Sequence, residues 1–156
     1  MAIEWNNTTL QEVCVLITDG AHFSPKDSYP GSPMGSVKDL TRFGIDYSSC
    51  RTISAEDFQK LVIQGCAPEF EDVLIAKDGN SSLDTVCVHR RHEPIVLLSS
   101  IAILRPDKAK IHPDYLRYFL DNPVEREALK ENFRSGSAIP RVVLKDFRKV
   151  PICIPN

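Results

Sequence analysis

The stretch Glu71–Pro106, EDVLIAKDGNSSLDTVCVHRRHEPIVLLSSIAILRP, decides the fold expected for this chain. It contains three apolar runs rich in Val and Ile, at Val73–Ala76, Thr85–Val88 and Ile95–Leu104. Asp-Gly, Asn-Ser-Ser and Arg-Arg-His-Glu-Pro segments break these runs, a pattern typical of consecutive strands joined by turns. The stretch therefore predicts a β-sheet core.

A tight turn is expected between the first two of these runs. Asp78-Gly79 supplies the positive-φ position that such a turn needs, and it places Lys77 and Asn80 at the rim of the turn. We therefore expect a rigid sheet that presents a polar, partly basic loop.

The chain before this stretch predicts a short strand, a long loop and one helix. Val13, Val15 and Ile17 alternate as in a strand. Residues 18–36 are dense in Gly, Pro, Ser and Asp, which predicts an irregular loop, and its His and aromatic residues favour an ordered loop that faces a ligand. Residues 54–57 resemble a capping box, so a helix is expected from there to Gly65.

Beyond residue 106 the apolar spacing changes to a helical period. His112-Pro113 begins one helix, and Asn122-Pro123 caps a second helix that ends near Phe133. The first helix carries a broad apolar stripe of Tyr115, Leu116, Phe119 and Leu120. Residues 134–141 are expected to form a flexible basic loop, and Val150–Pro155 a last edge strand. These elements predict an α+β fold: a twisted, partly barrel-like β-sheet core with a C-terminal helical hairpin packed against it.

Composition and charge restrict the class of protein. The 156 residues, 42% of them hydrophobic, suit one domain with a real core. The net charge is −2, but residues 130–149 hold six basic against two acidic residues, a weak indication of an anionic partner at that end. Five widely spaced cysteines without a C-x-x-C pair favour a reduced, cytoplasmic setting. No apolar run reaches the ~20 residues of a membrane span, so no membrane role is expected.

Catalytic motifs are missing from the sequence. It has no carboxylate-x-lysine element, no Gly-Lys dipeptide, no G-x-G, no Pro-Pro, no G-x-S-x-G and no H-E-x-x-H. A non-catalytic domain is therefore expected. Cys87, His89 and His92 offer metal-ligand types, which leaves a small zinc enzyme as an alternative. The lack of a fourth ligand favours a core position for Cys87 and an exposed turn for His92, and no metal site is predicted.

Several short segments, in order along the chain, resemble those of a known family. They are ITDGAHFSPK at 17–26, SVKD at 36–39, DVLIAKDG at 72–79, LRP at 104–106, GSAIP at 136–140, LKD at 144–146 and VPI at 150–152. Together they resemble the target recognition domain of type I restriction-modification specificity (S) subunits. The resemblance runs over nearly the whole chain and covers residues 1–156 as a single recognition domain, without the family's spacer helix or its second recognition domain.

The resemblance implies a module that reads one half of a bipartite target in double-stranded DNA. It implies no cofactor in this chain, because S-adenosylmethionine, Mg²⁺ and ATP are expected on the methylation (M) and restriction (R) subunits. Cationic and amide side chains on loops would contact the DNA. The candidates are Lys38, Arg42, Lys77, Asn80, Arg90, Arg91, Arg134, Arg141 and Lys145.

Two of these candidates suit base contacts and two suit phosphate contacts. Lys77 and Asn80 are the better candidates for base edges, because Asn can pair bidentately with adenine, whereas Arg134 and Arg141 suit phosphates. Asp19 and His22 are expected to brace the long loop by hydrogen bonds. A competing hypothesis is a protein-interaction module that docks a methyltransferase subunit through the helical hairpin, although core packing accounts for the same apolar residues.

Overall fold

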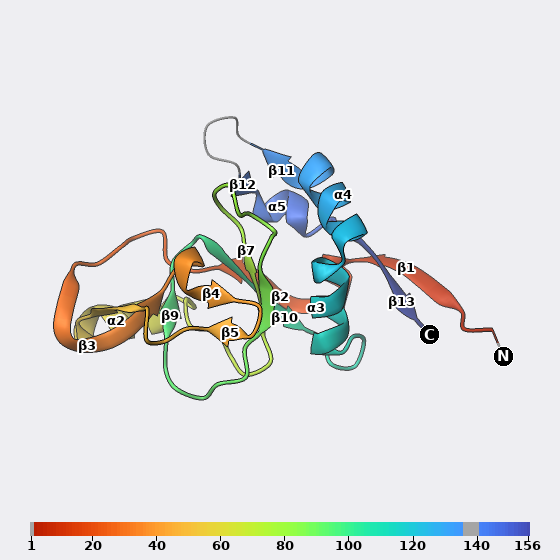
Figure 1. Ribbon diagram of the computed structural model, residues 1–156. Helices are drawn as coiled ribbons and strands as arrows, with labels where there is room; N and C mark the ends of the chain where they lie inside the picture. The colour runs from red at the N-terminus through yellow and green to blue at the C-terminus, as the bar shows by residue number, and fades with distance from the viewer. Residues whose placement is uncertain (1, 136–140) are drawn as a thin grey trace.

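The computed structural model describes residues 2–135 and 141–156. In Figure 1 a β-sheet occupies the middle of an elongated molecule, with α2 and β3 at one end and a two-stranded ribbon at the other. The helices are α1 (Leu10–Val13), η1 (Val37–Asp39), α2 (Ala55–Ile63), α3 (Pro113–Asp121), α4 (Pro123–Phe133) and α5 (Leu144–Phe147). The strands are β1 (Trp5–Thr9), β2 (Cys14–Asp19), β3 (Asp27–Gly35), β4 (Leu40–Thr41), β5 (Gly44–Ile45), β6 (Arg51–Ile53), β7 (Val73–Ala76), β8 (Val86–Val88), β9 (Val96–Leu97), β10 (Ile101–Pro106), β11 (Arg134–Ser135), β12 (Arg141–Val142) and β13 (Pro151–Pro155).

The central sheet has the strand order β2-β10-β7-β8, and every neighbouring pair is antiparallel. Successive residues of β7 point to opposite faces. Val73 and Ile75 pack in a large cluster with α3 and Phe147, while Leu74 and Ala76 pack in a second cluster with β4 and β5. Both faces of β7 are therefore covered, which accounts for its unbroken apolar sequence. The strand predicted at Val73–Ala76 is confirmed.

The expected single strand at 95–104 is wrong in one respect, because this run forms two strands in different sheets. β9 pairs in parallel with β3, whereas β10 pairs with β2 and β7. Ile101 N donates to Leu98 O over 3.1 Å, which closes a turn at the two serines between the strands. The chain therefore changes sheet at the polar interruption of the run.

The three expected helices are confirmed, and their capping residues explain where they begin. Ser54 accepts a hydrogen bond from Asp57 N, and Gly65 follows α2 with φ +82°. Asn122 accepts from Val124 N over 2.9 Å, a cap that contributes about 1 kcal/mol. The stripe of α3 packs on the large cluster, so the helical hairpin lies against the sheet as predicted.

Two expectations for the N-terminal part are wrong in part. The expected short strand is confirmed as β2, but Leu10–Val13 directly before it is a helical turn, and Val15 is exposed although it alternates with the buried Ile17. The second half of the long loop is strand β3, which pairs with β6 despite its glycines and prolines. The polar segment Trp5–Thr9 is strand β1, which pairs with β13 in the ribbon at one end of the molecule (Figure 1).

The last basic segment also differs from expectation. Its described ends form the hairpin β11–β12, in which Arg134 pairs with Val142 and Ser135 with Arg141. The segment GSAIP lies outside the described residues. The edge strand expected at the C-terminus is confirmed as β13.

The α+β class is confirmed. Within the part of the chain that the structure describes, the strands form five separate sheets, each of them open, and the helices pack mainly on one face of the central sheet. No helix of the described residues combines the length and apolar character that a membrane crossing requires.

Candidate nucleic-acid interface

Five of the nine predicted contact residues lie near one edge of the central sheet. At this edge the ends of β2 and β7 meet the β11–β12 hairpin and the start of α5 (Figure 1). A hollow of about 350 Å³ opens there. Its lining includes Asp19, His22, Lys77, Arg141, Leu144 and Lys145.

Backbone hydrogen bonds fix β12 beside the end of β7. Lys77 N donates to Ser100 O over 2.8 Å, and Val142 N donates to Lys77 O over 2.9 Å. Asp78 and Arg141 form an antiparallel bridge directly beyond these bonds. An isolated bridge and one backbone hydrogen bond therefore link the separate β11–β12 sheet to the end of β7 and place Arg141 at this edge.

Lys77 lies inside this edge rather than at its rim. The residue is only 8% exposed, and its Nζ lies 3.1 Å from Asp78 Oδ1 and 3.6 Å from Asp19 Oδ2. A buried ammonium group requires such partners, because burial without them is very costly. The expectation that Lys77 sits at an exposed rim is wrong, since the side chain folds back toward a carboxylate 58 positions earlier in the chain.

Asp19 also holds His22, as the sequence predicts. His22 Nε2 lies 3.1 Å from Asp19 Oδ1, and the imidazole itself is exposed. Asp19 thus joins the first turn of the long loop to the end of β7. Gly20 allows this arrangement, because a Cβ there would lie 2.1 Å from Leu97 O.

The exposed cations of this edge are Arg134, Arg141 and Lys145, which we call the cationic edge. In residues 2–135 and 141–156 none of the three forms an ion pair with a carboxylate, so their charges remain available to an anion. Asn80 is exposed on the β7–β8 loop, which begins at the same edge. The DNA contacts that the sequence predicts for these four residues stay predictions.

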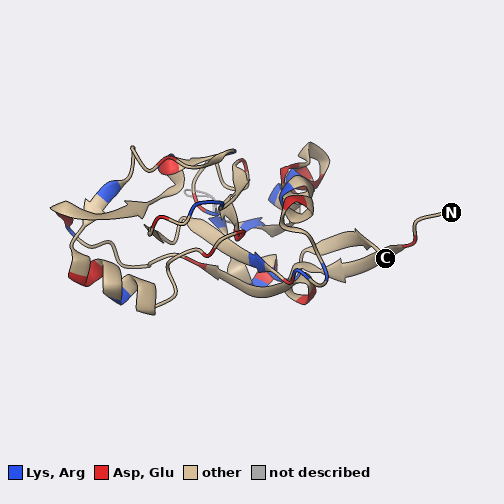
Figure 2. Ribbon diagram, turned by 90° about the horizontal axis from the view of Figure 1, so that it is seen from below, with Lys and Arg blue, Asp and Glu red and all other residues tan. Residues whose placement is uncertain are grey.

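The other four predicted contact residues lie elsewhere. Arg90 pairs with Asp114 at 2.8 Å, and Arg91 pairs with Glu93 and stacks over the ring of Tyr47 at 4.2 Å. Arg42 lies 5.5 Å from the ring centroid of Phe43, and Lys38 is exposed on η1. Figure 2 shows basic and acidic residues interleaved along the molecule, so the cationic edge is a local feature.

Cys87, His89 and His92 do not form a cluster. Cys87 is buried in the second hydrophobic cluster, His89 is 3% exposed, and His92 stacks on Phe70 with ring centroids 4.6 Å apart. Among the described residues, no group of three or more His, Cys, Asp or Glu side chains has an arrangement that could hold a metal ion. Cys87 takes the core position and His92 the exposed position that the sequence favours for them.

Sequence reasoning missed two arrangements. The first is the ion pair of Asp72 with Arg105, in which both residues lie within quoted segments but 33 positions apart. The second is a group of arginines and exposed aromatic rings around Phe43 and Tyr118. The signal in the sequence was the Arg42-Phe43 and Arg117-Tyr118 dipeptides, each an arginine beside an aromatic residue.

A scan against protein-family models finds no match, and a search of curated proteins finds none either. Solved structures do match over nearly the whole chain. The S subunit of a type I restriction-modification system from M. genitalium superimposes with a TM-score of 0.63 at 16% identity, covering 98% of this chain and 35% of that chain.

Two further solved structures agree with this match. A chain of a type I R-M system, solved to explain complex assembly and conformational transition, gives a TM-score of 0.65 at 21% identity and covers 97% of this chain and 34% of that chain. The HsdS subunit from Thermoanaerobacter tengcongensis gives 0.62 at 21% identity, over 97% and 33%. The fold is therefore that of an α+β domain found in type I S subunits. The chain spans about a third of the length of the solved structures that it matches.

Proposed function

We propose that this chain is a DNA target recognition domain of a type I restriction-modification specificity subunit. It reads one half of a bipartite duplex target and directs methylation and restriction subunits to that site. The observation that carries the proposal is the fold, which is shared over 97–98% of the chain with the structures above. The cationic edge supports it independently, because exposed cations without carboxylate partners suit a polyanion.

The residues of the edge divide into two roles. Arg134, Arg141 and Lys145 neutralise phosphates, which supplies most of the salt-dependent affinity and fixes the register of the protein on the duplex. Asn80 presents its amide from the β7–β8 loop and reads a base edge, with adenine as the bidentate partner. Lys77 acts by bracing this loop through Asp19 and Asp78.

The domain is non-catalytic in this proposal. Methyl transfer with S-adenosylmethionine, and ATP- and Mg²⁺-dependent cleavage, belong to the M and R subunits. The cysteine chemistry of this chain fits that assignment, because burial raises the pKa of Cys14 and Cys87 to about 12 and keeps both thiols protonated near neutral pH.

A selection from a random-sequence duplex library tests the proposal. The immobilised chain should enrich one short recurring sequence, because base contacts from a single module read only a few positions. The double variant Arg141→Ala with Lys145→Ala should retain far less DNA under the same salt conditions. A library that remains random after repeated rounds, with equal retention by parent and variant, contradicts the proposal.

The apolar stripe of α3, which motivates the competing docking role for the helical hairpin, supports core packing instead. Leu116 and Leu120 are fully buried, and Tyr115 Oη donates to Cys153 O over 2.5 Å. The apolar stripe of α3 therefore stabilises the domain itself. Replacing Tyr115 is expected to unfold the chain rather than to release a partner.

A further inference from the structure

A second hollow, of about 370 Å³, lies between the β4–β5 turn and helix α3. In Figure 1 the tip of this hairpin points toward α3. The volume falls within the range of sites that bind small ligands. Its lining includes Arg42, Phe43, Arg90, Asp114, Arg117 and Tyr118.

The β4–β5 turn holds Phe43 out in solvent. Thr41 pairs with Gly44, so residues 42 and 43 form a two-residue turn. Thr41 Oγ1 donates to Gly44 O over 2.8 Å and accepts from Phe43 N over 3.2 Å. Leu40 and Ile45 anchor the hairpin in the second hydrophobic cluster. Phe43 is 89% exposed on this braced turn.

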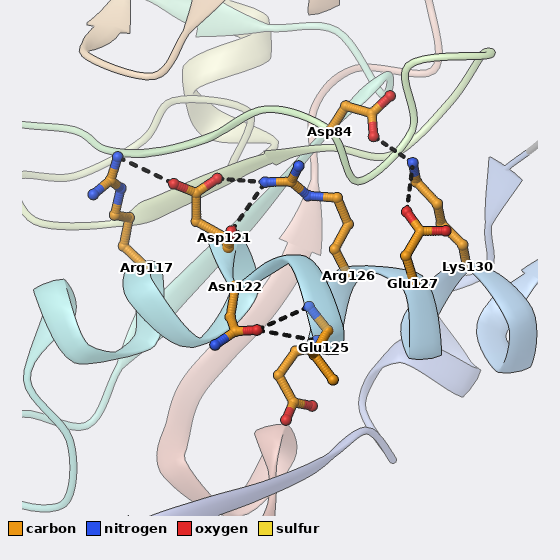
Figure 3. Close-up of polar contacts among 9 residues, drawn as sticks. Asp84, Arg117, Asp121, Asn122, Glu125, Arg126, Glu127 and Lys130 are labelled. Carbon is orange, nitrogen blue, oxygen red and sulfur yellow. Dashed lines mark hydrogen bonds and ion pairs between the residues drawn. The ribbon is translucent and has the colours of Figure 1, made fainter.

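Helix α3 presents a second exposed ring across the hollow. Tyr118 is 65% exposed, and the guanidinium of Arg117 lies 4.9 Å from its centroid. Arg117 is held in turn by Asp121, at 3.4 Å, and Arg126 holds the other oxygen of that carboxylate at 2.6 Å (Figure 3). The ion pairs of the helical hairpin thus fix one arginine beside the ring.

The charge of the hollow favours an anionic ligand. Three arginines line it against one carboxylate, that of Asp114, which pairs with Arg90 at 2.8 Å. In the part of the chain that the structure describes, Arg42 has no carboxylate partner, and its guanidinium lies over the Phe43 ring. Exposed rings beside arginines are the combination on which proteins stack nucleobases.

We infer that this hollow binds an unpaired nucleotide, with the base stacked against the exposed rings of Phe43 and Tyr118 and the phosphate beside Arg42. An acidic peptide would satisfy the charge but would leave both rings without a stacking partner. The nucleotide is either free or part of a strand whose base lies outside the helix stack. This inference rests on the proposed function in one point only, which is the origin of such a strand. The strand would belong to the duplex that the domain binds.

Fluorescence anisotropy with labelled (dT)6, and competition by dTMP, test the inference. Phe43→Ala and Tyr118→Ala should each weaken (dT)6 binding by about tenfold, since one stacking partner is removed. Tyr29→Ala is the matched control, because Tyr29 is 95% exposed on β3, away from the hollow. Circular dichroism should be unchanged in all three variants, whose side chains are exposed.

Two further arms identify the ligand. Competition by dTMP but not by inorganic phosphate assigns the site to nucleotides, and (dT)6 binding stronger than that of dTMP identifies a strand as the source. Phe43→Trp should bind (dT)6 as the parent does. The variant adds a second tryptophan to Trp5, and the fluorescence of the added indole should fall when dTMP stacks on it. Equal competition by phosphate and dTMP, with (dT)6 binding unaffected by Phe43→Ala and Tyr118→Ala, overturns the inference in favour of a simple anion site.

A fully paired duplex, measured with the same variants, separates this inference from the proposed function. If Phe43→Ala weakens (dT)6 binding and leaves duplex affinity unchanged, both stand. If the parent binds (dT)6 but no duplex, the proposed function fails and the nucleotide site stands. If the parent binds duplex but neither (dT)6 nor dTMP, the nucleotide site fails alone.

Discussion

Arg105 on β10 holds the buried carboxylate of Asp72, at the start of β7, through two hydrogen bonds of 2.9 Å each. The Asp72 side chain is 2% exposed, and its Oδ2 also accepts from Glu69 N over 2.7 Å. This bidentate pair joins two neighbouring strands of the central sheet. The hydrogen bonds that Arg105 donates to the Asp72 carboxylate raise the pKa of Arg105 above its ordinary value.

Removing Arg105 should destabilise the chain strongly, because the Asp72 carboxylate would remain buried without its partner. We expect Arg105→Ala to lower the free energy of unfolding by about 3 kcal/mol, since breaking a largely buried ion pair is costly. Urea denaturation measures this loss. Arg105→Lys should recover only part of it, because an ammonium group cannot form the two parallel bonds.

The matched control for this variant is Lys60→Ala, which removes an exposed ion pair with Glu56 on α2. Exposed pairs contribute little to stability, so its denaturation midpoint should stay close to that of the parent. A similar loss in both variants would show that the Asp72–Arg105 pair has no special role.

Gly20 should be the least replaceable glycine of the long loop. A Cβ at this position would lie 2.1 Å from Leu97 O and 2.5 Å from Leu98 O, both rigid backbone atoms. Gly20→Ala must therefore separate β2 from β9, and we expect a loss of more than about 2 kcal/mol. Thermal unfolding monitored by circular dichroism reports it.

Gly79→Ala provides the comparison, because a Cβ at Gly79 would meet no atom within 4 Å. Its cost comes only from the backbone, which has φ +87°, and amounts to about 1 kcal/mol. If Gly79→Ala is more damaging than Gly20→Ala, the close approach of β2 and β9 is not what requires glycine at position 20.

His89 should make the chain less stable as the pH falls below neutrality. Burial lowers the pKa of His89 below its ordinary value of 6.5, so the unfolded chain takes up this proton more readily than the folded chain. The contribution of His89 is complete above about pH 6.5 and decreases as the pH falls toward the folded-state pKa. Urea denaturation between about pH 5 and 8 measures it. His89→Gln should show a smaller decrease over this window, and an identical decrease would contradict the assignment.

Four of the five thiols, all buried or half-buried, should resist modification. Burial raises the pKa of Cys14, Cys50 and Cys87 to about 12, which leaves roughly one thiol in 10⁴ ionised at pH 8. Burial also raises the pKa of Cys66. A thiol-reactive disulfide reagent should therefore modify at most Cys153 rapidly in the folded chain and all five cysteines in urea. Rapid reaction of two or more thiols under native conditions contradicts this expectation.

Local signals were enough to predict the central elements of the fold. The Val and Ile of β7 predict a strand, and the caps Ser54 and Asn122 and the terminator Gly65 predict the ends of helices, because each acts through neighbours within four positions. The four-residue turn at Leu10–Val13 is too short to show a helical period. Its type is decided by packing instead.

Long-range contacts account for what the sequence could not predict. The polar strand β1 forms because it pairs with β13 at the other end of the chain. The burial of Lys77 likewise depends on Asp19, which approaches only when β2 and β7 lie in one sheet. The position of the cationic edge follows from β12 pairing beside β7, which no local pattern specifies.

The most direct test of the proposed function is the salt dependence of duplex binding. The duplex is the one enriched by the selection, and binding is measured from about 50 to 200 mM salt. The logarithm of the association constant should fall linearly with the logarithm of the salt concentration. Arg141→Gln and Lys145→Gln should each reduce the slope by about 1, whereas Lys60→Gln on α2 should not change it. A slope near zero, or the same slope in all four proteins, would contradict a role for the cationic edge in holding DNA.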